Sequence, residues 1–144
     1  MGIIDFFRNN MKNQPDAESD IRIYDSEYGN SSDFDDNRTV ADIKPYFDSV
    51  IRQNFSDCEY RIDVPARELA PGCHPACTPI QYLFYKNGKP SLAVVLVQSN
   101  TYRGMNVKGT QSICELLGIT YIRFFANCPN KTDYVVDRIR SYLK

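Results

Sequence analysis

The side chains best suited to metal binding lie in one loop, in the run Cys-His-Pro-Ala-Cys that extends from Cys73 to Cys77 and contains the only histidine, His74. Thiolate sulfur and imidazole nitrogen are common ligands of Zn²⁺, and Cys114 or Cys128 can complete the set after folding. A single C-x₃-C pair, however, lacks the paired spacing of zinc fingers and ribbons. We therefore favour the alternative, in which the thiols are reduced, His74 is exposed and no metal is bound.

A second stretch, NTYRGMNVKGTQ, is suited to phosphate. Arg103 and Lys108 supply positive charge, while Gly104 and Gly109 allow a ligand to approach the backbone closely. Because the stretch leads into a helix, amides of the first helical turn can face the same anion. The triplet that begins at Lys108 resembles the end of a P-loop, but the upstream glycine pattern is missing. The stretch therefore predicts phosphate binding without a cofactor.

Charge is distributed unevenly along the chain. Residues 1–57 contain 6 Lys and Arg against 12 Asp and Glu, a net of −6, and residues 58–144 contain 11 against 6, a net of +5. Such asymmetry is typical of an acidic segment beside a basic binding domain. The acidic segment can lie over the basic face or serve as a simple linker. Alternatively, both sets of charges are solvated surfaces.

The N-terminus begins with apolar residues, of which Ile3, Phe6 and Phe7 share one face of a helix. This face predicts contact with a membrane surface, a protein partner or a second copy of the chain, or packing on its own domain. No apolar run is long enough to span a membrane, and no signal peptide is recognisable. The five cysteines are an odd number without a secreted spacing, so we expect reduced thiols and a cytoplasmic protein.

We expect two parts: an apolar segment with an acidic linker over residues 1–38, and an α/β domain over residues 39–144. Residues 39–57 predict a helix capped by Asp42, with Pro45 in its first turn. Its apolar stripe consists of Ile43, Phe47, Val50, Ile51 and Phe55.

The rest of the domain alternates strands and helices. CEYRIDV predicts a first strand, and TPIQYLFY and SLAVVLVQS predict a hairpin closed by KNGKP. A helix follows, with Val107, Ile113, Cys114 and Leu117 facing inward and Gly118 after its end. ITYIRFF predicts an inner strand, and Asn130 is expected to cap a last helix with Val135, Ile139 and Tyr142 or Leu143 inward.

With CEYRIDVPARELAPG before it and VVDRIRSYLK after it, the stretch 78–126 resembles the minimal core of the PD-(D/E)xK, or restriction-endonuclease-like, superfamily. It looks most like small bacterial domains of the DUF2726 type. The hairpin with KNGKP, the run LAVVLV and the string GITYIRFF carry the resemblance, which covers residues 39–144. It implies an α/β fold with a restriction-endonuclease-like core, α-β-β-β-α-β-α, whose central mixed sheet is flanked by helices.

The resemblance also implies a nuclease centre, in which acids on two adjacent strands hold Mg²⁺ and a lysine follows the second acid. Between Pro79 and Lys108, however, the chain contains no Asp or Glu. Neutral residues hold the expected positions, in either register: Gln81, Val95, Leu96, Val97 and Gln98. We therefore expect the hydrolytic centre to be absent.

The favoured function is thus a non-catalytic domain that binds nucleic acid or a protein partner through the former active-site face. This hypothesis predicts that Gln81, Gln98, Arg103 and Lys108 line a shared surface. Two alternatives stay open. One is an active metal-dependent phosphodiesterase with migrated acids, Asp63 and Glu68, and Lys86 or Lys108 as its amine. The other is a structural or dimerisation module that uses the apolar N-terminus.

Overall fold

The computed structural model of this 144-residue chain describes residues 34–143. The apolar residues Ile3, Phe6 and Phe7 and most of the acidic linker lie outside the described residues. The fold is α/β, as predicted, with a four-stranded mixed sheet flanked by helices.

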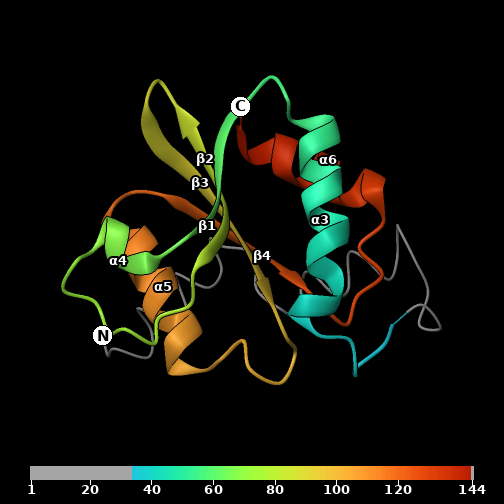
Figure 1. Ribbon diagram of the computed structural model, residues 1–144, viewed down its shortest axis with the longest axis horizontal. Coiled ribbons are helices and arrows are strands. Elements are labelled where there is room, and N and C mark those ends of the chain that lie inside the picture. Colours follow the sequence, from blue (N-terminus) through green and yellow to red (C-terminus); the bar gives the residue numbers. More distant parts are fainter. Residues whose placement is uncertain (1–33, 144) are drawn as a thin grey trace, which may run out of the picture.

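The elements follow one another along the chain as α3 (Val40–Asn54), β1 (Glu59–Val64), the single-turn α4 (Ala66–Leu69), β2 (Ile80–Lys86), β3 (Lys89–Val97), α5 (Met105–Leu116), β4 (Thr120–Phe125) and α6 (Thr132–Leu143). The strand order is β1-β2-β3-β4. The first three strands are antiparallel, and β4 runs parallel to β3 through the α5 crossover. Helices α3 and α6 cover one face of the sheet, and α5 with α4 lies on the other (Figure 1).

The β2–β3 hairpin closes as its sequence predicts. Asn87 and Gly88 both have positive φ, 54° and 77°, as a two-residue hairpin turn of this kind requires. The turn sets the register that pairs Lys86 with Lys89 and, further along, Tyr82 with Val94. Both strands therefore present alternate side chains to two covered faces, which explains the nearly continuous apolar run of β3.

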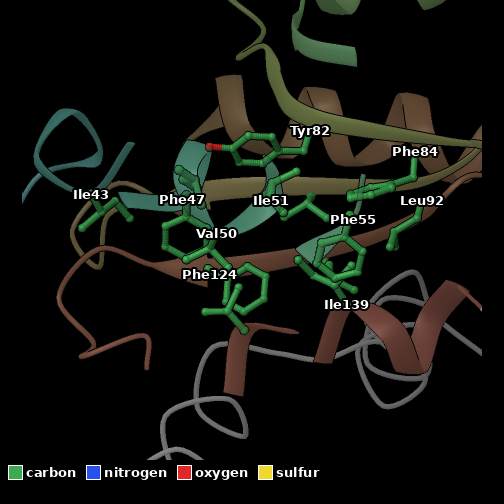
Figure 2. Packing of buried hydrophobic residues seen from close by; sticks show 14 of the residues in the cluster. Ile43, Phe47, Val50, Ile51, Phe55, Tyr82, Phe84, Leu92, Phe124 and Ile139 are labelled. Carbon is green, nitrogen blue, oxygen red and sulfur yellow. The ribbon is translucent and has the colours of Figure 1, made fainter. Parts of the chain in front are cut away.

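The α3 face of the sheet is rich in aromatic side chains. Phe47 of α3 is fully buried, and its ring centroid lies 5.3 Å from that of Phe124 on β4. Phe55 lies 5.5 Å from Phe84 in the same way, and α6 adds Ile139 (Figure 2). The predicted stripe of α3 is confirmed, since all its members are buried: Ile43, Phe47, Val50, Ile51 and Phe55.

The start of α3 differs from the prediction. Thr39, and not Asp42, is the N-cap: its hydroxyl accepts a hydrogen bond from the Asp42 amide (3.1 Å), and Asp42 accepts one from the Thr39 amide (2.9 Å). This capping box satisfies two donors at once and so outcompetes a cap at Asp42 alone. Pro45 consequently lies beyond the first turn, inside the helix.

Three other predictions about the helices and the last strand were wrong. β4 is buried but lies at the edge of the sheet, because the α5 crossover adds it beyond β3. Leu117 is 52% exposed because α5 ends at Leu116, although Gly118 follows with φ 73° as expected. Asn130 has φ 52° and does not cap α6. Its side-chain amide nitrogen donates hydrogen bonds to the carbonyls of Phe125 and Cys128 instead.

Strand β1 changes the face to which its side chains point at Asp63. Tyr60 packs against the α3-face cluster, and a regular strand would send Val64 to the same side. Instead, Val64 lies in the cluster beneath α5. Asp63 has φ 55°, a left-handed conformation that is unusual for a residue other than glycine, and its carboxylate lies 3.4 Å from Lys44 on α3. The reversal brings an acid of β1 next to α3.

Candidate functional site

The loop that follows β3 places Tyr102 over the sheet. The Gln98 carbonyl accepts hydrogen bonds from the amides of Thr101 (3.1 Å) and Tyr102 (3.0 Å), which turns the chain sharply. The Tyr102 ring then packs edge-on against Phe125, with centroids 5.2 Å apart. Gln98 therefore contributes to this region through its backbone, by fixing the position of an aromatic ring.

Cationic side chains gather around this ring. The guanidinium carbon of Arg103 lies 5.1 Å from the Tyr102 centroid, and that of Arg123 lies 5.7 Å from it. Arg123 is only 5% exposed. Burial, with the charges of Arg123 and Arg103, lowers the pKa of Lys108, while Glu115 opposes the shift. We call Tyr102, Arg103, Lys108 and Arg123 the basic cluster.

The amino end of α5 opens onto the basic cluster. Its N-cap is Gly104, which has no side chain to bond the first amides, and no acidic residue occupies the first turn. Helix α5 therefore presents amide groups and the positive end of its dipole beside the cations. Within residues 34–143, neither Arg103 nor Lys108 takes part in an ion pair. The arrangement can bind an anion such as a phosphate group.

The positions expected to hold nuclease acids lie next to this cluster. Val95 pairs with Arg123 and Val97 with Phe125 across the parallel ladder, and both valines face α5. The register of the hairpin brings Gln81 beside Val95 on the other side. Gln81 is 7% exposed, and its side-chain oxygen accepts a hydrogen bond from the Leu96 amide (3.0 Å). Gln81 therefore satisfies the backbone of β3 and does not line a surface.

Sequence reasoning missed Arg123, the most buried member of the cluster. The signal was present, because Arg123 is the one charged residue in the apolar run of β4. Tyr121 lies on the same face, two residues earlier in the strand. Its hydroxyl is buried and has no hydrogen-bond partner in the part of the chain that the structure describes. Burial raises the pKa of Tyr121, so the phenol is protonated at neutral pH.

A second polar cluster lies on the α3 side and consists of Lys44, Asp48, Asp63 and Tyr82. The ammonium of Lys44 lies 2.7 Å from Asp48 and 3.4 Å from Asp63. The buried Tyr82 donates a hydrogen bond of 2.5 Å to Asp48. Burial opposes ionisation of Asp48, but the bonds from Lys44 and Tyr82 hold its pKa below the ordinary value. Positive and negative charges are thus paired within this acid–lysine cluster.

The structure separates the two acids proposed as migrated metal ligands. Asp63 belongs to the acid–lysine cluster, whereas Glu68 lies 2.8 Å from Arg61, in an exposed ion pair. Lys86 lies at the hairpin turn, at the opposite end of β2 from the acids. Among the proposed amines, Lys108 belongs to the basic cluster.

The Cys73–Cys77 loop does not gather a set of metal ligands. All five cysteines are free thiols in the structure. The ring nitrogen Nδ1 of His74 accepts a hydrogen bond from the Ala76 amide (3.0 Å) and so serves the turn. Across residues 34–143, no three His, Cys, Asp or Glu side chains are grouped as metal ligands would be.

Comparisons with known proteins identify no relative: no family model, no curated protein and no solved structure matches this chain. No helix among residues 34–143 is both long and apolar enough to cross a membrane.

Proposed function

We propose that this chain is a non-catalytic domain of the PD-(D/E)xK type that binds nucleic acid through its phosphates. The observation that carries the proposal is the convergence of Arg103, Lys108 and Arg123 at the uncapped amino end of α5. The observed order of helices and strands supports the core that the resemblance implies, α-β-β-β-α-β-α with one short extra helix.

The chemistry of the cluster explains how a former nuclease face can bind without metal. In a nuclease, carboxylates hold a cation that neutralises the phosphate. Here Arg123 itself lies beside Val95, one of the positions where a carboxylate is expected. A guanidinium carries a permanent positive charge at that position, so the basic cluster can attract phosphate without Mg²⁺. It offers no activated water, which is why we propose binding without cleavage.

The test is a titration of the full chain with labelled single- and double-stranded DNA and RNA, with Mg²⁺ present. If the exposed Arg103 and the half-buried Lys108 contact duplex phosphates, affinity should fall about 12-fold between 50 and 200 mM salt, and the probe should remain intact. Absence of binding even at the lower salt would contradict the proposal and direct attention to a protein partner or a second copy of the chain.

A second candidate function, a metal-dependent phosphodiesterase, is favoured by the acid–lysine cluster, where Asp48 and Asp63 flank one lysine. In this form of the hypothesis, the two metal-binding acids are Asp48 and Asp63, and not Asp63 and Glu68 as the sequence suggested. It is the weaker candidate because the ammonium of Lys44 already pairs with both acids and a metal would have to displace it. Cleavage of the probe that EDTA abolishes, and that Asp48→Asn or Asp63→Asn reduces about 100-fold while Asp57→Asn does not, would establish it.

A further inference from the structure

The loop between β1 and β2 is held in place by two successive turns. The Cys73 amide donates to the Ala70 carbonyl (2.9 Å), and the Cys77 amide donates to the His74 carbonyl (3.0 Å). The second turn folds the chain back between the two cysteines. Disulfides need Cα atoms about 4.4–6.8 Å apart, a separation that two residues on either side of one tight turn can reach. Besides burial, Cys73 is one of the groups that raise the pKa of the Cys77 thiol, as expected if the two side chains lie near each other.

The sulfur of Cys77 packs against helix α5. A Cβ atom on Gly109 would lie 2.7 Å from Cys77 Sγ, so the sulfur rests directly on the helix where no side chain intervenes. Thr78 continues the contact, because its amide donates to the Asn106 carbonyl (3.2 Å) and its carbonyl accepts from the Thr110 hydroxyl (2.6 Å). The loop therefore holds Cys77 in a fixed position, and both cysteines are half-buried.

We propose that Cys73 and Cys77 form a reversible disulfide, which makes the β1–β2 loop a thiol–disulfide exchange site on the α5 face. The pairing is local, since the turn already brings the sulfurs together and the remaining cysteines lie elsewhere. Cys114 is buried on the core side of α5, Cys128 is buried in the same cluster after β4, and Cys58 precedes β1. This site is separate from phosphate binding and does not depend on it.

The reaction requires a low-molecular-weight disulfide such as oxidised glutathione as the oxidant. A cysteine thiolate attacks one glutathione sulfur, breaks its S–S bond and releases a glutathione thiolate. Burial raises the pKa of Cys77, so Cys73 is the first nucleophile and Cys77 the second. Cys77 then attacks the Cys73 sulfur and releases the second glutathione. Overall, the two cysteine thiols are oxidised to a disulfide, and one oxidised glutathione is reduced to two glutathione thiols, which take up both protons.

The test uses the full chain in glutathione buffers of increasing oxidised fraction, followed by acid quenching, alkylation with maleimide, digestion with trypsin and mass spectrometry. No Lys or Arg lies between Glu68 and Tyr85, so residues 68–86 form one peptide that contains both cysteines. We expect this peptide to become about 2 Da lighter and to take up no maleimide. The peptide with Cys58, the half-buried control, should carry maleimide or glutathione instead.

Two outcomes would overturn the proposal. Maleimide on both Cys73 and Cys77 at oxidised fractions that modify Cys58 would show that they do not pair. Glutathione on each of them would show two independent thiols. In Cys73→Ser, the remaining thiol of Cys77 should carry glutathione or maleimide, and the peptide should not lose about 2 Da. Cys77→Ser should behave in the same way, with Cys73 as the remaining thiol. Cys58→Ser should keep the loss, and circular dichroism of each variant checks the fold.

Discussion

The two faces of the sheet differ in how their charged side chains are arranged. On the α3 face, Lys44 lies between Asp48 and Asp63, and Tyr82 adds a hydrogen bond, so opposite charges are paired beside an aromatic core. On the α5 face, Arg103 and Arg123 flank one tyrosine ring near Lys108. Like charges held together do not stabilise a fold. The difference supports our proposal that the α3 face maintains the structure, whereas the α5 face serves for binding.

The largest effect is expected where the α3 face is most closely packed. Phe47→Ala removes a fully buried ring that contacts Phe124, and should lower the free energy of unfolding by about 3–5 kcal/mol. Urea denaturation followed by circular dichroism measures this. A loss below about 1 kcal/mol would show that the α3 face is not the main source of stability.

On the α5 face, Gly109→Ala tests the contact with the cysteine loop. The new methyl group would meet Cys77 Sγ at 2.7 Å, and we expect a loss of about 1–2 kcal/mol in the same unfolding assay.

In the matched control, Gly109→Ala is expected to raise the free energy of unfolding instead of lowering it. In a Cys77→Ala background the sulfur is absent, so Gly109→Ala should gain about 0.5–1 kcal/mol from the higher helix propensity of alanine. If Gly109→Ala has the same effect in both backgrounds, the loop does not rest on α5.

The acid–lysine cluster predicts a pH-dependent loss. Because the folded pKa of Asp48 lies below its ordinary value of 3.8, its ionised form stabilises the fold above that pH, and the gain is lost as pH falls through the folded pKa. Asp48→Asn should therefore cost about 1 kcal/mol or less at pH 7, since the side chain is partly exposed. The difference from the unmodified chain should shrink below about pH 4. An equal difference at both pH values would exclude the ionic interpretation.

The smallest effect is expected at Tyr121, whose buried hydroxyl has no partner among the described residues. Tyr121→Phe removes a polar group that is already unsatisfied, so stability should be unchanged or rise by up to about 1 kcal/mol. Thermal unfolding measures this. A loss above about 1 kcal/mol would mean that the hydroxyl has a stabilising partner after all.

The sequence was sufficient to predict the elements whose signals are local. The Asn87–Gly88 turn determined the hairpin, and the apolar stripe of α3 determined its buried face. The cap of α3 was misassigned because two residues near its start, Thr39 and Asp42, can each cap a helix, and only the reciprocal bonds distinguish them.

The candidate sites could be predicted only in part, because their members come from distant segments. Arg103 and Lys108 share one loop and helix, so their proximity is visible in the sequence, but Arg123 joins them only through the parallel pairing of β4 with β3. The contact of Asp63 with Lys44 depends on a backbone reversal that no local pattern requires. Gln81 was expected at a surface, yet the splayed end of the hairpin uses its side chain to satisfy a backbone amide.

The most direct measurement of the central claim compares the salt dependence of duplex DNA binding by two double variants of equal charge change. Arg103→Gln with Lys108→Gln removes cations from the basic cluster, and Lys86→Gln with Lys89→Gln removes exposed cations from the hairpin turn. We expect the slope of log affinity against log salt to fall by about 2 for the first variant and to remain unchanged for the second. Equal slopes for the two variants would contradict the assignment of phosphate binding to the α5 face.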